Sequence, residues 1–237
     1  MGTTKSTRSF NRPYHRAVAH ALRAFDPKFL THAACFFGGG TQLAMKLGEY
    51  RESRDIDFLC STRTGVQALR EQVTNRSLGA LVRGDAALEL ARDVRADRDG
   101  IRTFLIVDSV RLKFEIVFES RIDLAGELDR SLGVPSLGRE HAVAEKLLAN
   151  ADRGLDESTL ARDLIDLAFT AVHFGKPVVT AGLVMAEQAY GSAVRRYLAA
   201  SLAAFRDRKR AAVCIESLAV SDTATLRKGL RALRGWL

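Results

Sequence analysis

The chain has 237 residues, of which 47% are hydrophobic and 27% charged, the composition of an ordinary folded, soluble protein. It contains no run of about eighteen apolar residues, so a membrane-spanning helix is excluded, and its three cysteines lack metal-ligand spacing, which favours a reducing cytoplasm. The net charge of +8 favours an anionic partner such as nucleic acid or nucleotide.

The first predicted elements are a helix and a buried strand. Pro13 suits the first turn of a helix, and Tyr14, Val18 and Leu22 then recur on one face. The apolar run Cys35–Phe37 predicts a strand that enters the core.

A glycine turn follows this strand and precedes a predicted helix over Gln42–Leu47. Glycine lets another group approach the backbone closely, and free N–H groups at a helix N-terminus form an anion site. We therefore expect Gly39, Gly40 and Thr41 to hold the β- and γ-phosphates of a nucleotide. Taken alone, the glycine run is more typical of a plain turn.

Two carboxylates come next, on a second predicted strand. Asp55 and Asp57 face the same way because strand side chains alternate, and Ile56 and Phe58 face the core. At ~4 Å and an effective dielectric near 20, two such charges repel by about 4 kcal/mol. A divalent cation, above all Mg²⁺ with Mn²⁺ as an alternative, removes that cost. A D-x-D alone is usually a pair of surface charges, but beside a phosphate-binding turn it indicates metal-assisted phosphoryl or nucleotidyl transfer.

The order of these motifs resembles that of a known family. The glycine turn, then Arg51, Ser53 and Asp55–Phe58, closely resembles the signature of the AbiEii/AbiGii toxins, which belong to the DNA polymerase β-like nucleotidyltransferase superfamily. The rival phosphate motif, the P-loop, is absent, since no Gly-Lys-Ser/Thr follows the glycines.

The resemblance implies an α+β fold. We expect residues 1–135 to form the catalytic domain, a nucleotidyltransferase-like mixed sheet flanked by helices. We expect residues 136–237 to form a helical bundle that completes the nucleotide and acceptor cleft. Gly126, Gly133 and Pro135 mark the boundary between them.

After a helix over residues 66–73, an antiparallel meander is predicted. Turn signals at Asp97–Gly100, sharpest at its Asp-Gly step, and at Asp108-Ser109 separate three strand-like runs, Leu88–Val94, Ile101–Val107 and Val110–Phe118.

The last of these runs carries a charged face. Lys113, Glu115 and Glu119 lie opposite its apolar residues. Because superfamily members place a third acidic residue on such a strand, the resemblance makes Glu115 the candidate third catalytic carboxylate and metal ligand. Asp108 and Glu119, at strand ends, are weaker contenders. An ordinary exposed Lys113–Glu115 face is the alternative interpretation.

Two further predicted helices carry the second part of the resemblance. The first runs over Arg139–Arg153, and the next starts at Asp156 or Ser158 and ends at Gly175. The family has a lysine on one helix and an R-D-x-x-D-L pattern on the next, which here are Lys146 and Arg162–Leu167.

This second part implies roles for two side chains. It assigns Lys146 to the nucleotide phosphates and gives Asp163 a polar role at the cleft, where it positions Lys146 or the acceptor. An i,i+4 pair between Arg162 and Asp166, with no role beyond helix stability, remains open.

The remainder is predicted as a helix bundle. Ser221 is a candidate N-cap of the last helix, and the basic residues of the last two helices either form solvated faces or contact an RNA backbone. The predicted helices are Val184–Ala189, Ala193–Phe205, Ala211–Leu218 and Thr223–Leu237.

The predicted reaction is transfer of a nucleoside monophosphate from an NTP to an acceptor hydroxyl. Asp55 and Asp57 would bind two Mg²⁺ ions, and Glu115 would bind the ion that activates the hydroxyl. The resemblance implies a toxin of a toxin–antitoxin or phage-exclusion system, an RNA acceptor such as the 3′ end of tRNA, and an antitoxin encoded separately.

Two alternatives stay open at this point. One is a nucleotidyltransferase that modifies a small molecule or a protein. The other is a catalytically silent nucleic-acid-binding module of the same fold, which would keep its effect when Asp55 is replaced.

Overall fold

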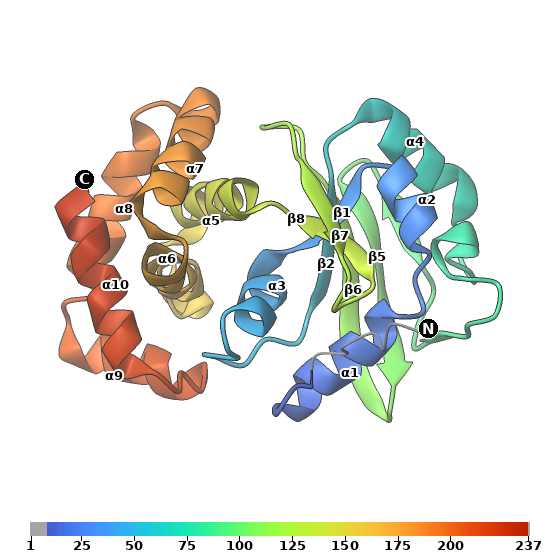
Figure 1. Cartoon of the computed structure of the whole chain (residues 1–237), viewed down its shortest axis with the longest axis horizontal. Helices are drawn as coiled ribbons and strands as arrows, with labels where there is room; N and C mark the ends of the chain where they lie inside the picture. The colour runs from blue at the N-terminus through green and yellow to red at the C-terminus, as the bar shows by residue number, and fades with distance from the viewer. Residues whose placement is uncertain (1–8, 237) are drawn as a thin grey trace, which may run out of the picture. The chain divides into compact units, whose positions relative to one another are not determined.

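The computed structural model describes residues 9–236, which divide into two compact units (Figure 1). Unit 1 holds the residues up to Thr41 and Arg54–Leu137, and unit 2 holds Gln42–Ser53 and the residues from Gly138 onward. Over the described range there are ten α-helices and one mixed eight-stranded sheet, with the helices concentrated in the C-terminal half. The predicted α+β class is therefore confirmed. The functional division into residues 1–135 and 136–237 stays a prediction.

Unit 1 is built on the sheet, whose strand order is β3-β5-β6-β2-β1-β8-β7, with β4 paired to β5. The β2–β6 and β1–β8 pairs are parallel and the others antiparallel, so the sheet is mixed. The strands are β1 Cys35–Gly38, β2 Ile56–Cys60, β3 Glu89–Leu90, β4 Arg95–Asp97, β5 Gly100–Val107, β6 Val110–Phe118, β7 Gly126–Asp129 and β8 Val134–Leu137.

One face of the central strands supplies the core of unit 1. The rings of Phe25, Phe58 and Phe114 have centroids 5.2–6.2 Å apart and are fully buried. Two short helices pack on the sheet: α1 (Pro13–Leu22) contacts β5 and β6, and α2 (Pro27–His32) contacts β1 and β8. Helix α2 lies on the same side of the sheet as α4 (Arg63–Gln72), with the 3₁₀ helix η1 (Gly79–Leu81) close by (Figure 1).

The meander differs in detail from its prediction. The run Leu88–Val94 forms a strand only at Glu89–Leu90, and the separate strand β4 forms the hairpin with β5. Asp97 pairs with Gly100, so the turn residues are Arg98 and Asp99 rather than the Asp-Gly step. The Asp97 carboxylate accepts hydrogen bonds from the N–H groups of Asp99 and Gly100, which stabilises this placement.

The second predicted turn is confirmed. Val107 pairs with Val110, and the two residues between them, Asp108 and Ser109, have φ of +50° and +62°. Positive φ at both central residues is what a type I′ hairpin turn requires. This turn sets the register of the β5–β6 pair.

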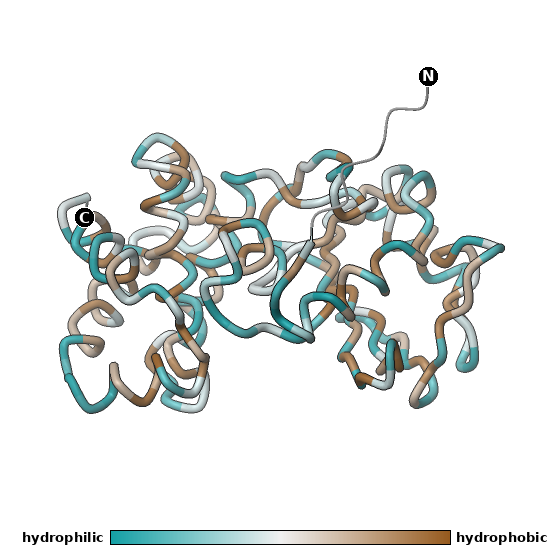
Figure 2. Tube along the Cα trace, turned by 60° about the horizontal axis from the view of Figure 1, so that its bottom comes forward, coloured by the Kyte–Doolittle hydropathy of each residue, from teal (hydrophilic) through white to brown (hydrophobic). Residues whose placement is uncertain are grey.

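Unit 2 is a helical bundle in which α6 packs against α5, α7, α8 and α10 (Figure 1). Hydrophilic segments lie mainly in loops and turns (Figure 2). No helix among residues 9–236 combines the length and the apolar character needed to cross a bilayer. The chain passes from unit 1 to unit 2 along α3 (Gly39–Lys46). The later helices are α5 Arg139–Arg153, α6 Arg162–His173, α7 Gly175–Tyr190, α8 Ala193–Ala204, α9 Arg208–Ser217 and α10 Thr223–Trp236.

The structure corrects several predicted helix starts, and two of the shifts are of three residues, since α4 begins at Arg63 and α9 at Arg208. Helix α3 begins at Gly39 rather than at Gln42, so the glycines form its first turn. Helix α6 begins only at Arg162, because Leu160 and Ala161 are left-handed and separate it from the 3₁₀ helix η2 (Glu157–Thr159). Helix α7 begins at Gly175, nine residues before the predicted start at Val184.

The last helix keeps its predicted start but not its predicted cap. The Asp222 side chain accepts from the N–H of Thr225 and caps α10, whereas Ser221 donates its hydroxyl to the Tyr50 carbonyl. Leu237, the predicted last residue of this helix, lies outside the described residues.

Candidate active site

The glycine turn lies directly beside the D-x-D carboxylates in unit 1. Gly38 is the register partner of Asp57 in the β1–β2 pair, and Gly39 follows it with φ of +71°. A Cβ atom at Gly39 would lie 2.7 Å from Asp57 Oδ2, so the carboxylate occupies the space that any other side chain would fill. The N–H groups of the first turn of α3, from Gly39, Gly40 and Thr41, are therefore next to this carboxylate.

The D-x-D residues show the predicted alternation. Ile56 and Phe58 are fully buried, while Asp55 and Asp57 are half-buried on the other face. Asp57 lies within β2, and Asp55 immediately precedes the strand.

Glu115 lies next to Asp57 across the parallel β2–β6 pair, where the two residues are register partners. Neighbouring strands are about 4.8 Å apart, and register partners of a parallel pair face the same side. The sheet therefore places Asp57 and Glu115 side by side on β2 and β6, and Gly39, which directly follows β1, approaches Asp57 from the start of α3. The two weaker contenders lie elsewhere: Asp108 contacts His20 at the β5–β6 turn, and Glu119 binds Arg121 just beyond the opposite end of β6.

The Glu115 carboxylate is held by two cations. Arg102 Nε lies 2.5 Å from Oε1, and Lys113 Nζ lies 2.6 Å from Oε2. Burial alone would raise the pKa of Glu115, but hydrogen bonds and charge from Lys113 and Arg102 outweigh it and lower that pKa. For Lys113, burial opposes the charge, and the carboxylates of Glu115, Asp57 and Asp55 raise its pKa. Glu115 is thus ionised, and its oxygens are engaged.

Sequence reasoning missed Arg102. It is the register partner of Glu115 on β5 and also contacts Asp97, with Nη1 2.9 Å from Oδ2. Only the β5–β6 register brings these residues together. The Asp108-Ser109 turn signal could have given that register, because a two-residue hairpin turn there pairs Val107 with Val110 and hence Arg102 with Glu115.

The carboxylates suit an oxygen-preferring divalent cation. Asp55 and Asp57 offer hard oxygen donors beside a backbone that approaches closely at Gly39. Within residues 9–236 no group of three His, Cys, Asp or Glu side chains is arranged to hold a metal ion. The oxygen donors of Asp55 and Asp57 are of the type that a divalent metal prefers, whereas each oxygen of Glu115 already accepts a hydrogen bond from a cation, Arg102 or Lys113.

A second cluster of charges lies within unit 2, around Asp166. Arg51 binds this carboxylate in bidentate fashion, with Nε 2.6 Å from Oδ1 and Nη2 2.8 Å from Oδ2. Tyr50 donates its hydroxyl to Oδ1 at 2.6 Å, and Lys146 Nζ lies 2.7 Å from Oδ2. The alternative of a simple Arg162–Asp166 helix pair is wrong, because Asp166 points into the interior of the unit.

Lys146 links this cluster to the other predicted residue of α6. Its Nζ lies 2.8 Å from Asp163 Oδ1, and Arg153 Nε lies 2.8 Å from Asp163 Oδ2. Only 6% of Lys146 is exposed, and Asp163 is buried. Burial would raise the pKa of Asp163, but Lys146 and Arg153 hold it well below its usual range. Nucleotide binding by Lys146 and Asp163 stays a prediction, and the contacts observed are with each other and with neighbouring charges.

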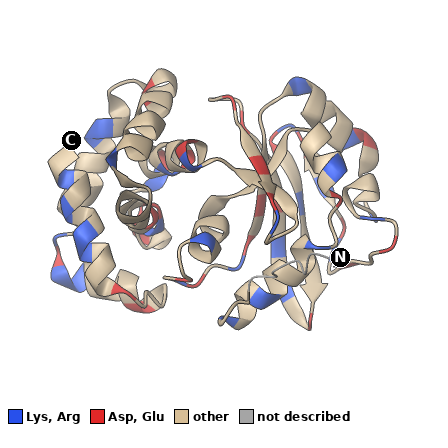
Figure 3. Ribbon diagram, viewed as in Figure 1, with Lys and Arg blue, Asp and Glu red and all other residues tan. Residues whose placement is uncertain are grey.

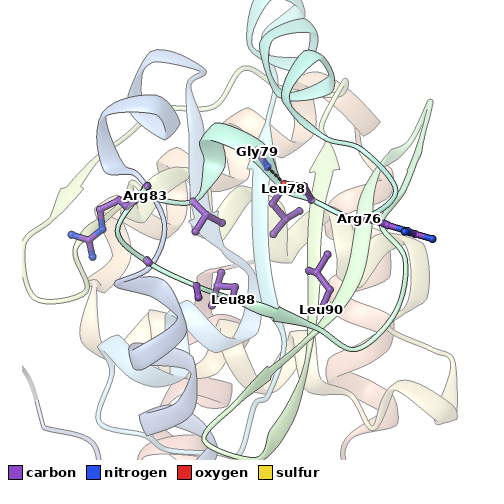
Figure 4. A pocket seen from close by; sticks show the side chains of 11 residues that line it. Arg76, Leu78, Gly79, Arg83, Leu88 and Leu90 are labelled. Carbon is purple, nitrogen blue, oxygen red and sulfur yellow. Dashed lines mark hydrogen bonds between the residues drawn. The ribbon is translucent and has the colours of Figure 1, made fainter.

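A hollow of about 330 Å³ lies elsewhere in unit 1, in the segment around η1 (Figure 4). Leu78, Leu88 and Leu90 point into it, while Arg76 and Arg83 point away. None of the predicted site residues lines it. Of its two charged lining residues, Arg76 and Arg83, neither points into the hollow, so it carries no role in the proposed chemistry.

Comparison with known families decides the identity of the chain. A family model described as nucleotidyl transferase AbiEii toxin, type IV toxin–antitoxin system, matches residues 20–228. The chain belongs to the AbiEii family. This confirms the predicted family and the predicted class of enzyme, a nucleotidyltransferase. No curated protein and no solved structure matches the chain.

Membership supplies the coarse biology of this AbiEii chain. The family is one of toxins in type IV toxin–antitoxin systems, which implies a nucleotide substrate and a cognate antitoxin. Nucleotidyltransferases generally use divalent metals, which agrees with the donor set at Asp55 and Asp57.

Replacement of Gly39 by Ala is expected to lower nucleotide transfer by roughly 100-fold, because a methyl group there displaces the Asp57 carboxylate and misplacement by ~1 Å costs about that factor. Transfer rates at saturating nucleotide measure the effect. Gly133→Ala is the matched control, since Gly133 has φ of +82° in the same unit but nothing within 4 Å of its added Cβ. Equal losses in the two variants would assign the effect to backbone strain.

Proposed function

We propose that this AbiEii protein transfers a nucleoside monophosphate from an NTP to a hydroxyl of an RNA acceptor, with Mg²⁺ as the metal. The observation that carries the proposal is the register that sets Asp57 beside Glu115 on β2 and β6, together with the close approach of Gly39, the first residue of α3, to the Asp57 carboxylate. The predicted tRNA 3′ end is the acceptor that we would test first, and Mn²⁺ is the alternative metal.

The roles follow from the chemistry of each group. The N–H groups of Gly39, Gly40 and Thr41 hold the β- and γ-phosphates, and Asp55 and Asp57 hold the metal. A bound divalent ion neutralises phosphate charge and lowers the pKa of a coordinated hydroxyl. The acceptor oxygen bonds to the α-phosphorus as the bond to pyrophosphate breaks, and the hydroxyl proton passes to water. Glu115 orients the acceptor side of the site; its lowered pKa makes it a weak base.

The charged cluster of unit 2 is assigned a supporting role. Lys146 is the proposed phosphate contact, and Asp163 positions its ammonium through the 2.8 Å contact. In the same proposal, residues 1–135 act as the catalytic domain and residues 136–237 as the helical domain. The free, buried thiols of Cys35, Cys60 and Cys214 support a cytoplasmic location.

Incubation with each α-labelled NTP, Mg²⁺ and total RNA tests the proposal, and we expect label in an RNA band that disappears with chelator. Parallel reactions with Mn²⁺ identify the preferred metal. Label in a protein or a small molecule instead would move the acceptor to the corresponding alternative. Absence of label from all three, with each of four nucleotides and both metals, would contradict the enzyme's proposed reaction and leave the silent nucleic-acid-binding module.

A further inference from the structure

Unit 2 carries a groove between its last two helices that none of the roles above uses. It has a volume of about 760 Å³ and extends from the end of α8 along α9 and α10. Its floor is apolar and includes Phe205, Leu226 and Leu230, all of them buried.

The walls of this groove are strongly basic. Five arginines line it and no Asp or Glu does: Arg206, Arg208, Arg227, Arg231 and Arg234. All five are exposed, and within residues 9–236 none of them forms an ion pair with a carboxylate. Figure 3 shows Lys and Arg recurring along α9 and α10. Two of the five arginines donate a neutral hydrogen bond, Arg227 to Thr223 and Arg234 to the Leu202 carbonyl. Because guanidinium groups without a carboxylate partner gather here around one concavity, the groove is complementary to an anionic ligand.

The spacing of the arginines suits a chain of phosphates. Arg227, Arg231 and Arg234 follow the i, i+4, i+7 pattern of one helix face and span about 10 Å at 1.5 Å per residue. Side chains spread over such a length can contact several successive phosphates of one nucleic-acid strand. Arg206 and Arg208 approach from the other side, at the start of α9. Guanidinium groups bind phosphate oxygens in bidentate fashion.

The floor distinguishes between two anionic partners. Of the large apolar side chains in the lining, Phe205, Leu226 and Leu230 are buried and Ile215 is half-exposed, so an acidic amphipathic peptide would find few large side chains on which to bury its own. Base stacking is excluded for the same reason, since Phe205 is the only aromatic residue in the lining. What remains is contact with a backbone, the mode by which base-paired RNA is recognised.

We propose that the arginine groove of α9 and α10 binds the phosphate backbone of a base-paired segment of the RNA acceptor. The proposal rests on the proposed function, because it names where that acceptor is held. Recognition here is independent of base sequence and sensitive to salt.

The test compares two double variants of the full chain that remove equal charge from the same helices. Arg208→Gln/Arg231→Gln removes two groove arginines, and Lys209→Gln/Lys228→Gln removes two exposed lysines that do not line the groove. Binding of a fluorescent 24-base-pair RNA duplex is measured by anisotropy over a range of salt concentrations. Loss of two phosphate contacts should weaken binding on the order of 10- to 30-fold at 0.15 M salt and reduce the salt slope by about two.

The lysine control should bind within about threefold of the parent chain, with circular dichroism showing that both variants are folded. Equal weakening in the two variants, or none in either, would overturn the groove as the binding site. Displacement of the duplex by poly-glutamate at matched charge concentration, together with duplex binding that does not depend on salt, would point to an acidic protein as the partner. That result would also overturn the groove as an RNA-binding site.

Failure of the proposed function gives a different pattern. The variant Asp55→Asn should bind the duplex as the parent chain does, because Asp55 belongs to unit 1 and the groove to unit 2. If no nucleotide reaches RNA while the groove variant alone loses duplex binding, the transfer reaction fails and the groove stands. If RNA is labelled normally by the groove variant, the groove fails and the reaction stands.

Discussion

Asp57→Asn is expected to reduce nucleotide transfer by roughly 1,000-fold, which corresponds to about 4 kcal/mol of transition-state stabilisation. The three atoms nearest to a Cβ built at Gly39 belong to Asp57, which is also in register with Glu115, so it lies where phosphate, metal and acceptor would meet. The substitution keeps the shape of the side chain and removes its charge. Single-turnover transfer of labelled nucleotide is the measurement.

A matched control separates this effect from a general loss of negative charge. Asp93→Asn removes an exposed carboxylate from the same unit and should leave the rate within about twofold of the parent. Thermal unfolding should show little change for either variant, since Asp57 is half-buried and lies at the site. Transfer by Asp57→Asn at more than a tenth of the parent rate would remove Asp57 from the catalytic group.

The largest expected effect on stability comes from Asp166. Asp166→Asn should destabilise the protein by about 3–5 kcal/mol, because it leaves the buried Arg51 without its carboxylate partner and Lys146 with Asp163 alone. For a chain of this size that corresponds to a fall of roughly 10 °C in the unfolding temperature. Denaturant unfolding, followed by circular dichroism, measures the free energy.

The matched control is an exposed ion pair in the same unit. Arg195 and Glu187 contact at 2.7 Å, but their side chains are 41% and 26% exposed. Glu187→Gln should therefore cost no more than about 1 kcal/mol. If Asp166→Asn costs as little as Glu187→Gln, the buried cluster does not stabilise the unit.

The same buried network predicts how the stability difference between the parent and Asp166→Asn depends on pH. Burial would raise the pKa values of Asp163 and Asp166, but the neighbouring Lys146 and Arg51 or Arg153 lower both. A lowered carboxyl pKa adds stability above the unfolded value of about 4, and that stability is lost as pH falls through the folded value. The difference in the free energy of unfolding between the parent and Asp166→Asn should thus be at its maximum at pH 6 and decrease progressively below pH 4.

The sequence by itself determined the local parts of the site. Alternation along a strand puts Asp55 and Asp57 on the face opposite Ile56 and Phe58, because successive strand residues point to opposite sides. The glycine run marks the junction between the strand and the helix, because glycine readily takes the φ of +71° found at Gly39, although the helix itself begins at Gly39 and not after the run. Each of these features depends on neighbours in the chain, and periodicity and backbone preference report such neighbours.

Tertiary structure alone decided which residues meet. The parallel β2–β6 register pairs Asp57 with Glu115, and the β5–β6 register places Arg102 beside Glu115. Arg51 reaches Asp166 from 115 positions away, so a motif residue with no assigned role became the bidentate partner of a buried aspartate. A local pattern states which face a charge occupies. The residue that pairs with this charge depends on strand register and on the requirement that every buried charge be balanced. Both are properties of the folded chain.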